Sequence, residues 1–94
     1  MAVFAVTYRY ADDTARLDEH RARHREYLRG LHDAGRLTLS GPTDDGGTAL
    51  IIMEADDEAA IAADLDQDPF ALEGLIAERT IQPWRIVIGS LDGR

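Results

Sequence analysis

The chain has 94 residues, enough for one hydrophobic core and short for two, so we expect a single domain over residues 1–94. Its 10 Lys+Arg against 18 Asp+Glu give a net charge of -8, which repels phosphate backbones and argues against nucleic acid or an anionic membrane surface as a partner. No cysteine is present, which excludes disulfides, a thiolate nucleophile and a cysteine-based zinc site, and suits a reducing compartment.

The N-terminal residues MAVFAVTYRY contain no basic leader and no apolar run near the ~20 residues that a membrane span needs. We therefore expect a cytoplasmic protein without a targeting segment or a membrane span. Residues 3–10 also alternate between two faces and are rich in β-forming side chains, which predicts a first strand.

From about Asp13 the pattern changes to the period of a helix. One helical face is formed by residues spaced three and four apart, namely Leu17, Arg21, His24, Leu28 and Leu31. Gly35 is a suitable residue to end this helix, because a positive φ costs glycine nothing.

Two further strands are predicted over residues 37–40 and 48–54. They flank the turn-rich segment 41–47, which is typical of a connection that closes an antiparallel hairpin. Asp56 or Asp57 can then cap a second helix.

The sequence Asp68-Pro69 predicts a further short helix, because Asp suits the N-cap and Pro suits the first helical position. A last strand is expected over residues 81–89, where Pro83 restricts it to a sheet edge or a strand start. One face of this strand would carry Trp84, Ile86 and Ile88.

The order β-α-β-β-α-β predicts a ferredoxin-like α+β fold, in which right-handed crossovers place both helices on one face of a four-stranded antiparallel sheet. The third strand is apolar on both sides, with Leu50 and Ile52 on one and Ile51 and Met53 on the other. In the last strand, Val87 would likewise lie opposite Ile86 and Ile88. A monomer would expose the second apolar face, whereas a homodimer with the two sheets packed face to face would bury it.

His24 is the first candidate for chemistry, because a titratable ring falls within the apolar face of the first helix. It could act as a general acid or base, or as a hydrogen-bond donor to a ligand. The alternative is a partly buried histidine that is satisfied by a purely structural partner.

Asp68 is the second candidate. By itself it is explained as a helix N-cap, worth about 1 kcal/mol. Near an imidazole, the same carboxylate would accept a hydrogen bond, select the tautomer and favour the charged ring. Because the first helix and the Asp-Pro turn should converge at one end of the sheet, we expect His24 and Asp68 to lie within reach of a direct or one-water hydrogen bond.

Metal and cofactor sites are not expected. His20 and His24 are four residues apart on a helix, but the residues between them include two arginines and no glutamate, and no third ligand is obvious. The Gly46-Gly47 pair lacks the Lys-Ser/Thr tail of a phosphate loop and follows two aspartates. No Gly-x-Ser-x-Gly motif indicates a serine nucleophile.

Over nearly its whole length the chain resembles the YciI-like (YCII-related) family. The resemblance rests on five segments in the expected order: His24-Arg25-Glu26-Tyr27-Leu28, Gly35-Arg36-Leu37, Ser40-Gly41-Pro42, Asp68-Pro69-Phe70 and Pro83-Trp84. It implies a ferredoxin-like dimeric α+β barrel. It also implies that His24 and Asp68 form an active-site pair, as the corresponding residues are regarded in that family.

The dimeric barrels related to this family include muconolactone isomerases and small monooxygenases. By analogy, we expect a pocket between helix and sheet that accepts a small cyclic or aromatic molecule. Tyr8 and Ser40 could supply hydrogen bonds there and Trp84 an apolar wall, although core or strand-end packing explains each of the three equally well.

Two hypotheses for the function follow. The first is an enzyme without a cofactor that uses His24 as acid or base and Asp68 as its orienting partner, in an isomerisation, elimination or hydrolysis of a small organic molecule. The second is a dimeric module that binds a small molecule without converting it. The two differ in whether a bound molecule is turned over or only retained.

Overall fold

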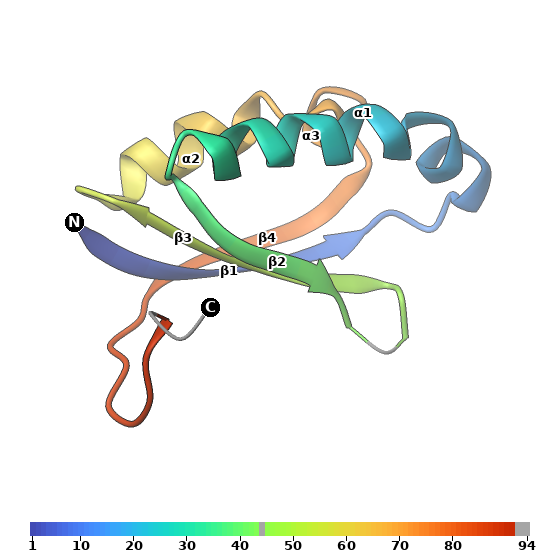
Figure 1. Cartoon of the computed structure of the whole chain (residues 1–94). Helices are drawn as coiled ribbons and strands as arrows, with labels where there is room; N and C mark the ends of the chain where they lie inside the picture. The colour runs from blue at the N-terminus through green and yellow to red at the C-terminus, as the bar shows by residue number, and fades with distance from the viewer. Residues whose placement is uncertain (44, 92–94) are drawn as a thin grey trace.

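The computed structural model describes residues 1–43 and 45–91. A four-stranded antiparallel sheet in the order β2-β3-β1-β4 is covered on one face by the helices, as Figure 1 shows. The ferredoxin-like α+β arrangement is therefore confirmed. The elements in chain order are β1 (Ala2–Tyr10), α1 (Thr14–Asp33), β2 (Leu37–Pro42), β3 (Thr48–Ala55), α2 (Glu58–Asp66), α3 (Pro69–Leu72) and β4 (Ile76–Pro83).

The core lies between the sheet and the helix layer. The alternation of β1 turns Phe4, Val6 and Tyr8 toward the helices, and each is buried. Their partners on the neighbouring central strand share that face and are Met53, Ile51 and Ala49. The helices close the core from above with Leu28, Leu31, Ile61 and Leu65.

The ends of the helices follow the expected signals. The Asp13 side chain accepts a hydrogen bond from the backbone N–H of Arg16 at the start of α1. Asp57, rather than Asp56, caps α2. Gly35 has a φ of +81°, so it takes the left-handed conformation after α1 that its position predicts.

The last strand differs from the expectation. β4 spans Ile76–Pro83 instead of residues 81–89, and the chain leaves the sheet after the backbone N–H of Trp84 donates to the Val3 carbonyl oxygen at 2.9 Å. No strand within residues 1–43 and 45–91 pairs with the apolar residues after Pro83, so β propensity alone does not make them a strand. The polar residues of β4 are compatible with its place at a sheet edge.

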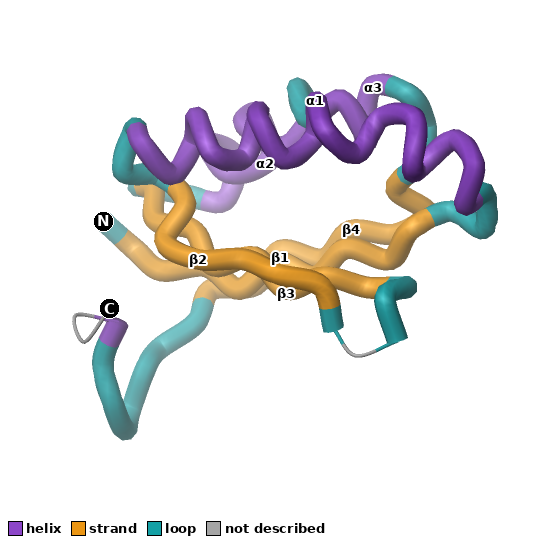
Figure 2. Tube along the Cα trace, turned by 45° about the vertical axis from the view of Figure 1, so that its right-hand side comes forward, coloured by secondary structure: helices purple, strands orange, loops and turns teal. Residues whose placement is uncertain are grey.

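We call the sheet face turned away from the helices the outer face. Of the two large apolar side chains that β3 places there, Leu50 is 43% exposed and Ile52 is 2% exposed. Residues 84–91 extend on this same side of the sheet (Figure 2), where Val87 and Ile88 are 82% and 92% exposed. The expected apolar residues are thus present, but those after Pro83 lie on an extended segment and not on a strand.

None of the helices in residues 1–43 and 45–91 combines the length with the apolar character that a membrane crossing requires.

We predict that the packing of α2 on the sheet contributes strongly to stability. Leu65→Ala should lower the free energy of unfolding by about 2–5 kcal/mol, because Leu65 is fully buried and its truncation leaves a cavity. Leu72→Ala, the same change at an exposed site on α3, should cost less than about 0.5 kcal/mol. Urea unfolding measures both, and equal losses would contradict this account of the core.

Candidate active site

His24 and Asp68 meet in the interior, although they come from different elements. α1 presents His24 on its buried stripe, and Asp68 is the N-cap residue of α3. His24 Nδ1 lies 2.8 Å from Asp68 Oδ1 and 2.9 Å from Oδ2, with the two residues 6% and 0% exposed. The hydrogen bond expected between them is present, while their use in catalysis stays a prediction.

The Asp68 carboxylate accepts two more hydrogen bonds. The Tyr8 hydroxyl donates to Oδ2 at 3.0 Å, and the backbone N–H of Phe70 donates to Oδ1 at 3.0 Å. An ionised carboxylate has no proton to donate, so the proton between the two side chains belongs to His24 Nδ1. Asp68 is therefore a helix cap and the partner of the imidazole at once, which makes the two interpretations of this residue compatible.

Aromatic contacts hold the His24 ring from a second direction. The Phe70 ring stacks on it, with the centroids 4.0 Å apart and the planes 8° from parallel. Tyr10 in turn packs edge-on against Phe70 at 5.6 Å. The stacking fixes the plane of the imidazole, and the bond to Asp68 fixes its rotation within that plane, so Nε2 has a defined direction.

A cavity of about 820 Å³ lies beside this ring, between α1, β2 and the β2–β3 turn. His24 and Phe70 form part of its wall, while Asp68 lies behind them. Its apolar lining includes Leu28, Leu37 and Ile51. The volume falls within the range of about 300–1,000 Å³ that is typical of small-molecule sites.

The three residues expected to bind a substrate lie in different places. Ser40 lines the cavity, because it pairs with Ile51 in the sheet and shares its helix-facing side. Tyr8 is fully buried behind the cavity and reaches Asp68 instead. Trp84 is not part of the cavity wall in the single chain, since it follows β4, at the sheet edge opposite β2.

Other residues of the cavity were not recognised from the sequence. Phe70 was noted only within a sequence motif, and Tyr10 only as part of a strand. Three arginines of α1 also line the cavity, namely Arg21, Arg25 and Arg29. Their regular four-residue spacing is a signal that sequence reasoning could have used, because it places all three on one side of a helix.

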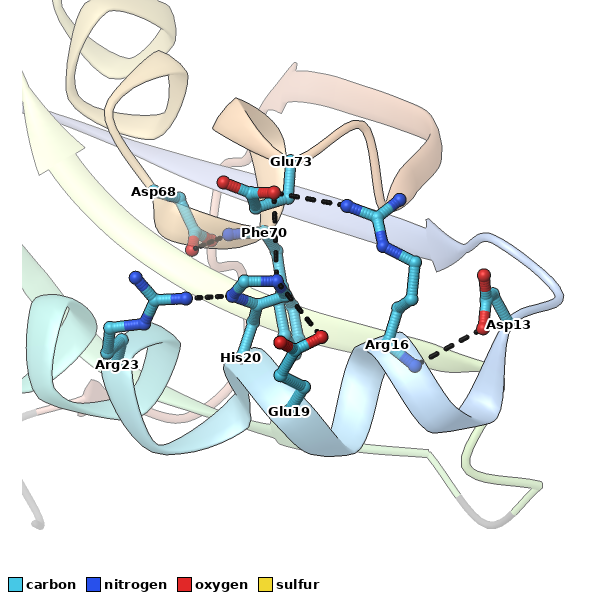
Figure 3. Close-up of polar contacts among 8 residues, drawn as sticks. All are labelled: Asp13, Arg16, Glu19, His20, Arg23, Asp68, Phe70 and Glu73. Carbon is cyan, nitrogen blue, oxygen red and sulfur yellow. Dashed lines mark hydrogen bonds and ion pairs between the residues drawn. The ribbon is translucent and has the colours of Figure 1, made fainter.

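His20 is buried next to this site but has different partners. Figure 3 shows its Nε2 beside Glu19 and Glu73, at 3.7 and 3.6 Å, and its Nδ1 in contact with Arg23. Arg16 also binds Glu73, at 3.1 Å, so this network joins α1 to α3. Across the described residues, no three His, Cys, Asp or Glu side chains are grouped to hold a metal ion.

The electrostatic environment keeps the buried tyrosine neutral. Burial raises the pKa of Tyr8 far above its usual value, and the negative charge of Asp68 and the hydrogen bond to it act in the same direction. Burial, followed by Asp68, also raises the pKa of Tyr10, whereas Arg21 and Arg25 oppose that rise. Tyr8 therefore serves as a permanent donor to Asp68 and not as a base.

Comparison with known proteins identifies the family. Residues 1–85 match the model of the YCII-related domain. This chain belongs to the YCII-related domain family. The family resemblance seen in the sequence is thereby confirmed. The comparison with curated proteins gives no significant match.

Solved structures with the same fold include 5-chloro-2-hydroxyhydroquinone dehydrochlorinase (TftG) from Burkholderia phenoliruptrix, in complex with 2,5-dihydroxybenzoquinone. It is 24% identical with a TM-score of 0.75, covering 88% of this chain and 93% of that chain. A NIPSNAP domain protein from Burkholderia xenovorans is 18% identical, with a TM-score of 0.57 and coverages of 93% and 95%. A protein of the antibiotic biosynthesis monooxygenase type from Bacteroides thetaiotaomicron is 18% identical, with a TM-score of 0.56 and coverages of 93% and 90%.

We predict that Tyr8→Phe changes stability in a pH-dependent way. At about pH 7 it should cost about 1–3 kcal/mol, because Asp68 loses a buried donor. Above about pH 10 the unfolded parent releases the Tyr8 proton while the folded parent keeps it, so its stability falls by up to about 1.4 kcal/mol per pH unit from this group. The variant lacks this contribution and should lose stability less steeply. Urea unfolding over this range measures both slopes, and parallel curves would contradict the assignment.

Proposed function

We propose that this protein is a small enzyme without a cofactor, in which His24 and Asp68 act as an acid–base pair on a small cyclic or aromatic metabolite. The observation that carries the proposal is the buried hydrogen bond between Asp68 and His24 Nδ1, in a ring that forms part of a cavity wall. A carboxylate placed behind an imidazole raises the basicity of the opposite nitrogen and stabilises the imidazolium that forms.

The chemistry that suits this arrangement is proton transfer. Nε2 of the neutral His24 removes a proton from a carbon or hydroxyl group of the substrate, and the imidazolium then returns it to another atom or to the leaving group. Isomerisation, elimination and hydrolysis all need such a step. Asp68 acts as a positioning residue, because it contacts His24 and does not line the cavity.

The nature of the substrate is supported by the cavity and by one structural neighbour. Apolar side chains and the Phe70 ring line much of the wall, which suits a flat ring. TftG, whose fold this chain shares, is a dehydrochlorinase of a hydroxylated ring and was crystallised with 2,5-dihydroxybenzoquinone. Small hydroxylated rings are therefore the first compounds to test.

The alternative is a dimeric module that binds a small molecule without converting it. In that case the bond between His24 and Asp68 serves only to attach α3 to α1, as the stacking of Phe70 on His24 also does. Both hypotheses place the ligand in the same cavity, so binding alone does not separate them.

Asp68→Asn separates the two hypotheses. The substitution replaces one of the two oxygen atoms that lie 2.8 and 2.9 Å from His24 Nδ1 by an amide N–H donor, and it removes the negative charge that stabilises the imidazolium. When that donor faces Nδ1, Nδ1 becomes the acceptor, so Nε2 carries the proton and no longer acts as a base. We expect a folded protein with at least a hundredfold loss of turnover, by analogy with the wrong-tautomer effect in triads. Imidazole nitrogen NMR reads the tautomer, and loss of 5-chloro-2-hydroxyhydroquinone and related rings reads turnover.

His24→Gln should show a loss of similar size, and the double variant should be no worse than either single one, because the two residues act as a unit. His20→Gln is the matched control, since His20 is a buried histidine of the same helix that does not line the cavity and bonds Arg23 and Glu73 instead of Asp68. Full turnover in a folded Asp68→Asn protein would contradict the proposal that His24 and Asp68 act as an acid–base pair. A parent protein that binds these rings and returns them unchanged would favour the binding module.

The proposal includes a homodimer with the outer faces packed together, in the cytoplasm as the lack of cysteines suggests. Leu50 and Leu39 are exposed on β3 and β2, and register places Leu39 beside Ile52 on the outer face. The segment after β4 adds the exposed Val87 and Ile88 on the same side. Burying this apolar surface in a second copy would remove it from water.

Sedimentation at micromolar concentration should give twice the 10.4 kDa chain mass. Leu50→Glu should shift the protein toward the monomer, because a carboxylate would be buried without a partner in the interface. Leu72→Glu, the same change at an exposed leucine of α3 in the helix layer, should leave the dimer intact. A parent that sediments as a monomer would exclude this part of the proposal.

A further inference from the structure

We infer that the cavity binds an anionic ring compound, whose negative group is held by Arg25 and Arg29 of α1 while its ring lies against the apolar wall. This inference deepens the proposed function and rests on it for the location of the ligand. It assigns a charge class to the ligand and binding roles to two arginines that no step of the acid–base chemistry uses.

The first observation is the sign of the charge around the cavity. Arg21, Arg25 and Arg29 all contribute to its lining. No Asp or Glu among the described residues does so, although the chain carries 18 acidic residues and a net charge of -8. The cavity is thus a positive region in a negative protein, and such a region attracts anions.

The second observation is the lack of partners for two of these arginines. Arg21 pairs with Asp18, but within residues 1–43 and 45–91 no carboxylate lies within ion-pairing distance of Arg25 or Arg29. Other arginines, such as those at positions 16, 36 and 79, do have carboxylate partners. Among the described arginines without a carboxylate partner, Arg25 and Arg29 line the cavity, whereas Arg23 and Arg85 lie outside its lining. The cavity therefore holds two guanidinium groups whose charge no carboxylate of the described residues neutralises.

The position of Arg25 on the helix makes this arrangement costly without a ligand. It has an arginine four residues away on either side, and Ala22 and Leu28 at the positions three residues away. Like charges at four-residue spacing repel each other and destabilise a helix. A bound anion between these side chains would turn the repulsion into attraction.

The third observation is that this positive charge acts on a side chain of the cavity wall. Arg21 and Arg25 both counteract the rise in the pKa of Tyr10, whose side chain lines the cavity. Tyr10 packs against Phe70, and Phe70 stacks on His24. The guanidinium groups of Arg21 and Arg25 and the imidazole of His24 therefore lie around the same cavity.

The chemistry of the wall narrows the class of anion. Arginine binds carboxylates and oxyanions through a planar set of donors. The apolar side chains of Leu28, Leu37 and Ile51 in the same lining offer no hydrogen bond to an inorganic anion but suit a ring. A carboxylate, phenolate or enolate attached to a small ring would bind the arginines through its negative group and contact the apolar lining through its ring. Negative charge that develops while His24 removes a proton would be stabilised by the same arginines.

The test compares two quinones that differ in charge. The two hydroxyl groups of 2,5-dihydroxybenzoquinone are vinylogous acids and are ionised at neutral pH, whereas 2,5-dimethoxybenzoquinone keeps the ring and stays neutral. Calorimetry measures the affinity of the parent for each, and amide NMR shifts of Gly41 and Gly46 in the cavity lining report where they bind. We expect the anion to bind the parent at least about tenfold more tightly, and this preference to weaken as salt is added.

Arg25→Gln combined with Arg29→Gln should remove this preference and leave the affinity for the neutral ring within about twofold. Arg23→Gln is the matched control, because it removes the same charge from the same helix outside the cavity lining. Arg25→Gln alone should unfold at the same or a higher urea concentration than the parent, since it relieves repulsion. A purely structural role for Arg25 would instead lower that concentration and leave ligand preference unchanged.

The outcomes separate this inference from the proposed function. Equal binding of the two quinones, or an unchanged preference in the arginine variant, would overturn the anionic class while the cavity and its acid–base pair remain. Arginine-dependent binding of the anion without any turnover would support the anionic class and count against the enzyme. Shifts confined to residues outside the cavity, or no binding of either ring, would overturn both.

Discussion

The burial of one carboxylate constrains most of this structure. Asp68 is fully buried, and an ionised group in that position is tolerated only when donors satisfy its oxygen atoms. Here the donors come from three elements: the Tyr8 hydroxyl of β1, the His24 imidazole of α1 and the Phe70 N–H of α3. The requirement to satisfy Asp68 therefore ties the central strand to both helices at one end of the molecule.

The same requirement gives His24 its defined geometry. Because Asp68 also accepts from Tyr8 and Phe70, its carboxylate has little freedom to rotate away from the ring. The cap of α3 brings Phe70 onto the flat side of the imidazole, so one turn of chain supplies both the hydrogen bond and the stacking contact. Asp68, which its local sequence explains as a helix cap, therefore also fixes the geometry of the candidate active site.

Much of this arrangement could be predicted from local patterns. The alternation of β1 and the period of α1 are strong signals, because each reflects which side chains meet the core. Asp68-Pro69 marks the start of α3 correctly, since capping depends on adjacent residues alone. The contact between His24 and Asp68 was expected only because the topology brings α1 and α3 together, and the role of Tyr8 as a donor to Asp68 required the three-dimensional structure.

The bounds of the last strand and the arginines of the cavity could not be predicted for one physical reason. A local sequence pattern does not specify which other segment of the chain will lie beside it. Residues 84–91 have the composition of a strand, but no strand of the described residues pairs with them. The polar residues of β4 are compatible with a strand, because a strand at the sheet edge pairs with only one neighbour. Trp84 follows β4 and lies outside the cavity wall of the single chain, and its role in binding stays a prediction. The arginines of α1 were overlooked for a related reason, since only the packing of β2 beneath α1 converts a charged helix side into the lining of a cavity.

The charged groups of the site lie in an order that explains why Asp68 is buried and why Arg25 and Arg29 line the cavity. Asp68 lies behind His24, the cavity lies in front of it, and Arg25 and Arg29 line that cavity. With the proposed anion in place, the order becomes carboxylate, imidazole, anion and guanidinium. When His24 takes up a proton, every neighbouring pair in this series has opposite signs, so the charged intermediate state is stabilised from both sides of the ring. In a protein of net charge -8, the absence of carboxylate partners leaves the charges of Arg25 and Arg29 free to act on an anion in this cavity.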